Sequence, residues 1–298
     1  MTEVHFRLAR DEPGDAKAFR ALSNSLYARK IDERYYRWQF FDCPHAPLLM
    51  TGWAGERMVA AYGVHVISSG VEVAGMSLDI MIADDHQGCG LIAPLAQAAI
   101  DEARRRGALR LAVIGNARAR DAMSRRLGWK TWQVLADWTR LTAGTDSAPA
   151  EPVARPPPAS LAPGARTFYP RDEATLAWRT EQSPRYDYTW LRAGPPEAPQ
   201  GWSVIKLFRD PVSGEGFGDI VGLFLSQVGG SPEPILQATL AWLDAQNVGQ
   251  AAFYPAGLAE NAAAKALGFT ASRRERYLCG EGDAPPGLNI GMLDVDVY

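Results

Sequence analysis

Residues 77–128 of this chain read SLDIMIADDHQGCGLIAPLAQAAIDEARRRGALRLAVIGNARARDAMSRRLG. The alternating apolar run over 77–83 predicts a strand, and the glycine-containing turn over 87–91 precedes a long helical stretch. A second apolar run over 109–114 and a second helical stretch over 117–127 complete the segment. The order strand, loop, helix, strand, helix predicts an α/β unit whose loop follows the end of a strand.

The loop of this unit has the composition of an anion site. Glycine lets the backbone approach a ligand closely, and the first amides of a helix have no partners within the helix, so they can face a pyrophosphate. Residues 87–92 are therefore a candidate phosphate cradle, and a plain turn that caps the helix fits the same residues. The loop is not a P-loop, because no Gly-Lys-Ser/Thr follows it, and the GxGxxG spacing of dinucleotide folds is absent.

The run DIMIADDHQGCGL over 79–91, with a helix, a strand ending at Asn116 and a helix ending in LGW after it, resembles the core of the GNAT N-acetyltransferase superfamily. In that family the loop pattern [QR]xxGx[GA] holds the pyrophosphate of acetyl-CoA with its amides. Gln87 and Gly90 match the pattern, and Ile92 stands where Gly or Ala is usual. The resemblance implies acetyl-CoA as cosubstrate, bound by Met81, Ile82, Ala83, Gln87, Gly88, Cys89, Gly90, Leu91, Ile92 and Asn116.

The same resemblance suggests catalytic roles. A backbone amide of the fourth strand, here within 81–83, serves the acyl carbonyl in the family. A tyrosine four residues before the closing glycine commonly protonates the leaving thiolate, and Ser124 occupies that position here. Asp79 is the best-placed carboxylate on the strand for a general base, with a water chain as the alternative. The candidate catalytic residues are therefore Asp79 and Ser124.

Length and composition limit the class of protein. A chain of 298 residues favours about two domains of roughly 150 residues each. Apolar residues make up 47% and charged residues 22%, which is typical of a folded globular protein. The formal net charge of -3 argues against a polyanion as the main partner, so we expect no nucleic acid partner.

Cysteine and histidine usage gives no sign of a metal or a disulfide framework. Cys43, Cys89 and Cys279 lack CxxC spacing, and the four histidines show no spacing of metal ligands. Neither an export signal nor an apolar stretch of about 18 residues is present in the sequence given. These features predict a cytoplasmic protein without a membrane partner, and they leave the oligomeric state open.

A change of composition suggests the domain boundary. Residues 144–166 are rich in proline and small residues, so we expect a linker rather than a packed core. It would separate an N-terminal domain over 1–143 from a C-terminal domain over 167–298. The aromatic helical segment around Trp38 is expected in the core, with a wall of the substrate site as the alternative. Trp38 is accordingly the candidate substrate contact.

The two halves of the chain repeat each other. Trp38 and Pro44 form a WxxxxxP pattern, and Trp178 and Pro184 form it again 140 residues later. A single register across both halves is better explained by duplication than by chance. The same offset pairs Asp79 with Asp219, Gln87 with Gln227, Gly90 with Gly230, and Gly128 with Gly268.

The copies differ where an anion would bind. The second loop reads QVGGSPEP, and Pro232 has no amide to offer. Asn116 becomes Ala256, and the basic second helix of the first copy loses most of its arginines. We infer that the first copy binds the cofactor and that the second is structural or shapes the acceptor pocket. The retention of Asp219 there favours a shared structural role for Asp79 over catalysis.

Nearly the whole chain is similar to two-lobed GNAT proteins with an intact loop only in the first lobe and a final acidic strand, here over 292–296. This implies an α/β (α+β) fold of two tandem lobes, each a mixed, mostly antiparallel sheet flanked by helices. The implied activity is acetyl-CoA-dependent N-acetyl transfer to a small-molecule or saccharide-linked primary amine. The alternatives are a noncatalytic acyl-CoA-binding or scaffolding protein and an aminoacyl-tRNA-using transferase, which the acidic net charge disfavours.

Overall fold

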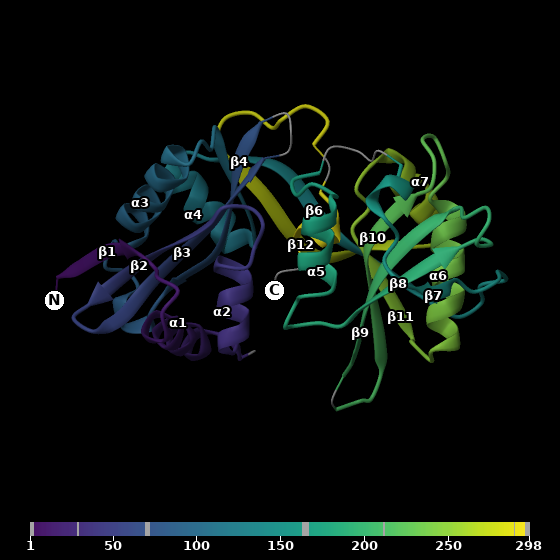
Figure 1. Cartoon of the computed structure of the whole chain (residues 1–298), viewed down its shortest axis with the longest axis horizontal. Coiled ribbons are helices and arrows are strands. Elements are labelled where there is room, and N and C mark those ends of the chain that lie inside the picture. The colour runs from purple at the N-terminus through teal and green to yellow at the C-terminus, as the bar shows by residue number, and fades with distance from the viewer. Residues whose placement is uncertain are drawn as a thin grey trace. The chain divides into compact units, whose positions relative to one another are not determined.

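The computed structural model describes residues 3–28, 30–68, 72–162, 167–210, 212–288 and 290–295, and the chain forms two compact units (Figure 1). Neither unit is continuous in sequence. Unit 1 consists of Met1–Val134, Gln182–Arg185 and Arg276–Ala284, and unit 2 of Leu135–Glu181, Tyr186–Glu275 and Pro285–Tyr298. The division therefore differs from domains separated at the expected linker, because each unit takes in segments from the other half of the chain.

Unit 1 is built on a sheet with the strand order β1-β2-β3-β4-β5-β12. Its registers are antiparallel except for β4 with β5. The elements are β1 (Val4–Leu8), α1 (Pro13–Leu26), α2 (Glu33–Phe40), β2 (Pro47–Ala54), β3 (Arg57–Ser68), β4 (Val73–Ile82), the short 3-10 helix η1 (Asp84–His86), α3 (Ile92–Arg105), β5 (Arg110–Gly115), α4 (Ala117–Leu127) and the start of β6 (Lys130–Leu141).

Helices cover both faces of this sheet. Figure 1 shows α1 and α2 on one side of the strands and α3 and α4 on the other. The main core lies on the α3 side, where alternate residues of β3, such as Tyr62 and Val64, pack against Leu95 and Ile100. On the opposite face, Gly63 leaves room for Phe40, whose ring atom would lie 2.7 Å from an added Cβ. The alternation of buried side chains thus gives the sheet two covered faces.

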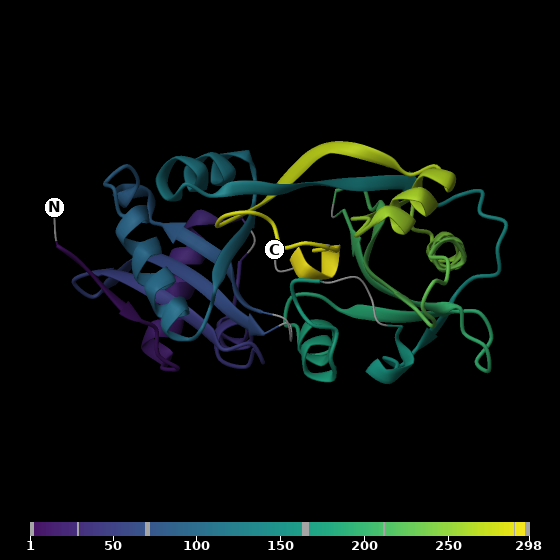
Figure 2. The same ribbon diagram turned by 90° about the horizontal axis from the view of Figure 1, so that it is seen from above.

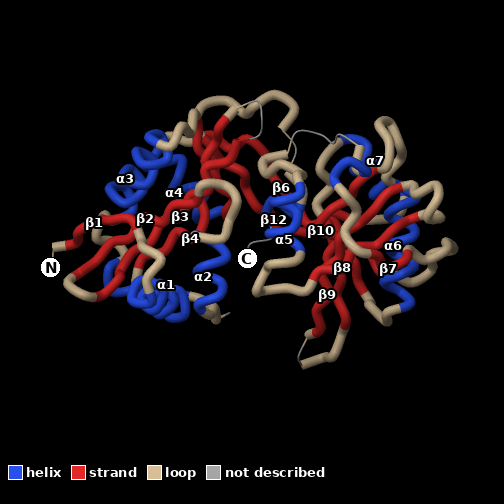
Figure 3. The backbone as a smooth tube through the Cα atoms, in the orientation of Figure 1, coloured by secondary structure: helices blue, strands red, loops and turns tan. Residues whose placement is uncertain are grey.

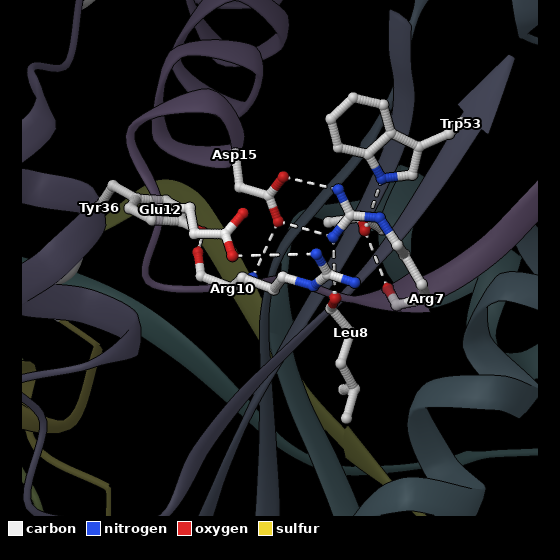
Figure 4. A network of polar contacts seen from close by, with 8 residues as sticks. Arg7, Leu8, Arg10, Glu12, Asp15, Tyr36 and Trp53 are labelled. Atoms are coloured by element: carbon white, nitrogen blue, oxygen red, sulfur yellow. Dashed lines mark hydrogen bonds and ion pairs between the residues drawn. The ribbon is translucent and has the colours of Figure 1, made fainter. Parts of the chain in front are cut away.

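The start of α1 is held to the sheet by a buried carboxylate (Figure 4). Asp15 accepts hydrogen bonds from both terminal nitrogens of Arg7, at 2.7 and 2.6 Å, and from the amide of Arg10 at 2.8 Å. The guanidinium of Arg7 also lies over the ring of Trp53, 4.5 Å from its centroid. Tyr36 of α2 donates to the carbonyl of Arg10, so both helices are anchored at the same place.

Unit 2 has the strand order β6-β11-β10-β9-β8-β7 (Figure 3). Here β10 pairs in parallel with β11, as β4 does with β5 in unit 1. Its elements are the end of β6, β7 (Glu151–Val153), the 3-10 helix η2 (Pro158–Ser160), α5 (Glu173–Thr180), β8 (Tyr188–Ala193), β9 (Gly201–Arg209), β10 (Gly216–Leu225), α6 (Glu233–Ala245), β11 (Gln250–Phe253), α7 (Leu258–Ala266), β12 (Thr270–Gly280) and α8 (Met292–Val295).

Two long strands explain why the units are discontinuous (Figure 2). Strand β6 leaves unit 1 and its last residues pair with β11, from Trp138↔Phe253 to Leu141↔Gln250. Strand β12 leaves unit 2 and its last residues pair with β5, from Tyr277↔Gly115 to Gly280↔Ala112. Each sheet is therefore completed by a strand that begins in the other half of the chain. For this reason a single domain boundary between the halves does not divide the chain into its two units.

The tandem architecture is confirmed. Helices α2 and α5 begin and end 140 residues apart. Their caps are also equivalent, because Asp32 accepts from the amide of Tyr35 at 3.0 Å and Asp172 from that of Thr175 at 2.8 Å. An aspartate at this position satisfies an amide that the helix leaves without a partner.

Two segments differ from the expectations. Part of the proline-rich stretch is the strand β7, and Ala150 beside it belongs to the core of unit 2. Pro152 is tolerated because β7 is an edge strand, where one side of the backbone needs no partner. The expected strand over 292–296 is wrong, since Met292–Val295 is helical. Asp294 accepts from the amides of Gly291 and Tyr169 and from Arg171, which stabilises that turn; residue 296 lies outside the described residues.

Candidate functional site

Strand β4 carries a β-bulge in its second half. Leu78 pairs with Gly63 and Met81 with Ala61, so two residues of β4 lie opposite one residue of β3. The first of the two, Asp79, has a φ of 46°. Aspartate is one of the few residues that enters this left-handed region, because its short polar side chain can bond locally. Bulges re-aim a side chain, and here the bulge positions the carboxylate of Asp79.

The bulge coincides with the point where β4 and β5 stop pairing. Their register runs from Ala74↔Arg110 to Ser77↔Val113, and within the described residues no later pair joins the two strands. The amide of Ala83 donates to the carbonyl of Val59 at 2.8 Å, on the side of β3. Because amides alternate along a strand, Met81 also donates toward β3, and the amide of Ile82 faces the edge toward β5. Of the three predicted backbone donors, Ile82 is thus the one that faces this opening.

The loop after β4 is stiffened by its own side chains. Gln87 donates from Nε2 to the carbonyl of Ile82 at 3.3 Å and to the carboxylate of Asp84 at 2.8 Å. Arg57 forms an ion pair with Asp85, and His86 bonds to the same carboxylate, so the pKa of Asp85 is held well below its usual range. The two acidic side chains of the loop therefore each have a donor partner.

The backbone amides from Gly88 to Ala93 form a continuous row of donors. Throughout the described chain no protein acceptor takes a hydrogen bond from these amides, and helical bonding begins with Leu95 donating to Leu91 at 3.1 Å. Gly88 and Gly90 both have a φ of 78°, and an added Cβ at either would meet no atom within 4 Å. Residues 88–90 are exposed and residues 91–93 half-buried, and the row ends at Pro94, which has no amide N–H. A helix N-terminus of this kind suits an anionic group.

The equivalent loop of unit 2, residues 228–233, has lost half of these amide donors. The amide of Gly230 donates to the carbonyl of Gln227 at 3.2 Å, and that of Glu233 to the hydroxyl of Ser231 at 3.2 Å. Pro232, which stands where the first copy has Ile92, has no amide N–H. This contrast agrees with the interpretation that only the first copy offers an anion site.

Asp79 is the buried titratable group of the site. Its side chain is 8% exposed, and burial raises its pKa to about 6, although the hydrogen bond from Tyr35 and the positive charge of Arg185 oppose the rise. The hydroxyl of Tyr35 donates to Oδ2 of Asp79 at 3.1 Å. A carboxylate with a pKa near neutrality is suited to accepting and releasing a proton at physiological pH.

Two residues of this environment were missed in the sequence. Tyr35 lies in the aromatic segment around Trp38 that the sequence places in the core, and it is only 2% exposed, yet its hydroxyl donates to Asp79. Arg185 lies far away in sequence, and its guanidinium lies over the ring of Tyr35, 4.9 Å from the centroid. The sequence signal available for Arg185 was its place directly after the proline of the second WxxxxxP pattern.

The other residues predicted to bind cofactor or substrate lie in the helices and in the loop after β4. Asn116 caps α4 by accepting from the amide of Ala119 at 3.0 Å, so its side chain is engaged in the helix. Ser124 is exposed on the same helix, and Ile92 begins α3 half-buried. Trp38 is buried, with its ring 5.8 Å from that of Tyr35. Cys89 is exposed within the loop, beside the row of amides.

Among the described residues, no three His, Cys, Asp or Glu side chains come together in a way that suits a metal ion. The helices of the described chain are all too short or too polar to cross a bilayer.

Comparison with known proteins matches residues 17–129 to the Acetyltransferase (GNAT) family. A GCN5-related N-acetyltransferase from Anabaena variabilis ATCC 29413 shares the fold at 12% identity and a TM-score of 0.63, with 93% of this chain and 72% of that chain covered. A tandem GNAT protein from the clavulanic acid biosynthesis pathway shares the fold at 14% identity and a TM-score of 0.62, with 95% of this chain and 99% of that chain covered.

A third structure of this fold comes from Enterococcus faecalis V583 and is described as a conserved protein of unknown function and a probable N-acyltransferase. It has 10% identity and a TM-score of 0.65, with 94% of this chain and 72% of that chain covered. At such identities the likeness establishes the fold alone. Comparison with curated protein sequences gave no match.

Proposed function

We propose that the protein is an acetyl-CoA-dependent N-acetyltransferase, on the premise that residues 17–129 match the Acetyltransferase (GNAT) family. The acceptor is the primary amine of a small or saccharide-linked molecule. The observation that carries the proposal is the row of amides from Gly88 to Ala93 beside the opening between β4 and β5.

The residues present fit acetyl-CoA. A row of backbone donors at the start of α3 suits a pyrophosphate, and the glycines at 88 and 90 keep side chains out of its way. The amide edge of β4 around Ile82 is available to the amides of the pantetheine arm and to the acyl carbonyl. When bound, acetyl-CoA supplies the acetyl group as a thioester, which is reactive toward an amine.

Asp79 has properties of a general base that its counterpart does not share, because Asp219 forms an ion pair with Lys206 at 3.1 Å, whereas Asp79 accepts a hydrogen bond from Tyr35. An amine is protonated at neutral pH and must lose a proton before it can attack a carbonyl carbon. The carboxylate of Asp79 takes that proton, and its pKa of about 6 leaves it mostly ionised at pH 7 while making it more basic than an ordinary aspartate. The amide of Ile82 stabilises the negative charge that develops on the carbonyl oxygen. The new C–N bond forms as the C–S bond breaks, and CoA leaves as a thiolate. The proton that the nitrogen loses on becoming an amide balances the one that the thiolate takes up from solvent.

The leaving group needs a proton, and the usual tyrosine is replaced by Ser124. Alkyl thiols are far more acidic than alcohols, with about 8.5 as the pKa of a free cysteine, so the thiol of CoA can leave as a thiolate and be protonated by solvent. In this chain, Ser124 stands on α4 at the position where the family commonly has the tyrosine, and its side chain is exposed. Loss of the tyrosine is therefore compatible with turnover.

Calorimetry with acetyl-CoA and a CoA-release assay test the proposal together. Binding of acetyl-CoA, followed by release of CoA that depends on an added amine, is the expected result. Failure to bind at millimolar acetyl-CoA would refute the proposal. Tight binding without release across a broad panel of amines would instead support the alternative, a noncatalytic acyl-CoA-binding protein.

A further inference from the structure

A short segment from the second half of the chain belongs to unit 1. Residues Gln182–Arg185 are part of that unit, whereas Glu181 before them and Tyr186 after them belong to unit 2. The segment follows α5 and contains Pro184, and the amide of Arg185 donates to the hydroxyl of Ser183 at 3.4 Å. A turn stiffened by a proline and a side-chain bond presents its residues in a defined direction.

The segment brings a charge to the surroundings of Asp79. The guanidinium carbon of Arg185 lies 4.9 Å from the centroid of the Tyr35 ring, within the range of a cation–π contact. The hydroxyl of the same tyrosine donates to Oδ2 of Asp79 at 3.1 Å. A cation on the face of a phenol withdraws electron density from the ring, which makes the hydroxyl a stronger donor. Arg185, Tyr35 and Asp79 thus form one chain of contacts.

We propose that Arg185 is a positioning residue for Asp79, which it serves through the ring of Tyr35, so that the second half of the chain completes the reaction site of unit 1. The role of Arg185 in a reaction rests on the proposed function, whereas its effect on the carboxyl of Asp79 does not. It also gives the second copy of the repeat a task that does not require it to bind acetyl-CoA.

The groups that face Asp79 determine what loss of Arg185 would do. They are Tyr35 from α2, Arg185 from the segment after α5, and Tyr27 at the end of α1, whose pKa is raised by burial and by the charge of Asp79. Of the described groups named here, Arg185 is the cation. Its positive charge stabilises the carboxylate, so removing it raises the pKa of Asp79 further and leaves a smaller ionised fraction at neutral pH.

The repeat supplies a comparison. The position equivalent to Arg185 in the first half is His45, which is buried. The arginine is therefore a difference between the copies rather than a residue that the repeat requires. A purely structural role would be met by any side chain of similar length that fills the same space.

The experiment titrates Asp79 directly. The carboxyl carbons of aspartate are labelled with 13C in the full chain, and the Asp79 resonance is assigned by its loss in Asp79→Asn. Arg185→Met keeps the length of the side chain and removes its charge, while Arg185→Lys keeps the charge and loses the planar stacking group. Arg192→Met is the control, because Arg192 pairs with Glu151 in unit 2.

We expect the Asp79 carboxyl to titrate near pH 6 in the wild type and about one unit higher in Arg185→Met, with a smaller change in Arg185→Lys and none in the control. In an amine-dependent assay, the acidic limb of the pH profile of kcat/KM should move to higher pH together with the pKa of Asp79. An unchanged titration in Arg185→Met overturns the inference. Absence of turnover in the wild type would refute the proposed function instead, while the titration would still decide the role of Arg185.

Discussion

The hydroxyl of Tyr35 donates a hydrogen bond of 3.1 Å to Oδ2 of Asp79, and this contact joins helix α2 to the bulge of strand β4. It connects a residue of the aromatic helix, which is mostly core, to the residue with the strongest claim to catalysis. The contact places a buried carboxylate at the point where β4 and β5 separate. Whether Asp79 acts as a base therefore depends on its environment and can be tested through its neighbours.

Replacing Tyr35 by phenylalanine removes this hydrogen bond and keeps the ring. Since the bond favours the ionised carboxylate, its loss should raise the pKa of Asp79 and move the acidic limb of kcat/KM upward by about one pH unit. The rate should recover at higher pH. Tyr36→Phe is the matched control, because the hydroxyl of Tyr36 donates to the carbonyl of Arg10. A shift of equal size in both variants would contradict the prediction.

Replacing Asp79 by asparagine should abolish the acidic limb and stabilise the fold at alkaline pH. The pKa of Asp79 is raised from 3.8 to about 6, because the folded protein favours the protonated carboxyl over the buried carboxylate. The stability that the protonated carboxyl gives relative to the carboxylate is present below pH 3.8 and is lost as the pH rises through 6. The predicted stabilisation by Asp79→Asn is roughly 3 kcal/mol at pH 8 and falls to about 0.5 kcal/mol at pH 4. Asparagine tolerates the positive φ at this position. Urea unfolding at pH 8 and pH 4 measures the free energy of unfolding of the variant and the wild type. An equal difference between the two proteins at both pH values would contradict the prediction.

Replacing Gly90 by alanine tests the amide row. The φ of 78° makes a side chain unfavourable by about 1 kcal/mol, and the shifted backbone should lower the affinity for acetyl-CoA at least several-fold. Gly229→Ala in unit 2 is the control, because its φ is 79° and an added Cβ there also meets no atom within 4 Å. Calorimetry should show weaker binding only for the first variant. Weaker binding in both would mean that strain alone explains the loss.

Replacing Asp15 by asparagine tests the anchor of α1 (Figure 4). Burial acts to raise the pKa of Asp15, but the hydrogen bonds from Arg7 and from the amide of Arg10 outweigh it and lower the pKa. The carboxylate therefore stabilises the fold above pH 4, and this contribution is lost as the pH falls through the lowered pKa.

The loss at pH 7 should be about 2 kcal/mol, as for hydrogen bonds to a charged group, and it should shrink on acidification. Asp11→Asn breaks an exposed pair with Arg37 and should cost at most about 0.5 kcal/mol. Denaturant unfolding from pH 7 to pH 3 measures both variants. A loss that does not depend on pH would show that the charge of Asp15 has no part in it.

Much of the fold follows from local pattern. Alternating apolar residues place the strands, an aspartate or asparagine caps α2, α4 and α5, and Gly128 ends α4 with a φ of 68°. These signals act over a few residues, so a single sequence contains them in full. The 140-residue repeat likewise needs no coordinates, and it predicted both the tandem lobes and the loss of amide donors in the second loop.

What the sequence by itself determined is therefore the elements, their repetition and the loop that offers amides to an anion. Tertiary structure alone decided the exchange of β6 and β12, because the pairing of distant strands is set by the whole sheet and not by either strand. It also decided that Asp79 sits at a bulge under the hydroxyl of Tyr35, and that Arg185 from the other half of the chain lies over that ring. Burial and charge act through space, so residues separated by more than a hundred positions together set the pKa of one carboxylate.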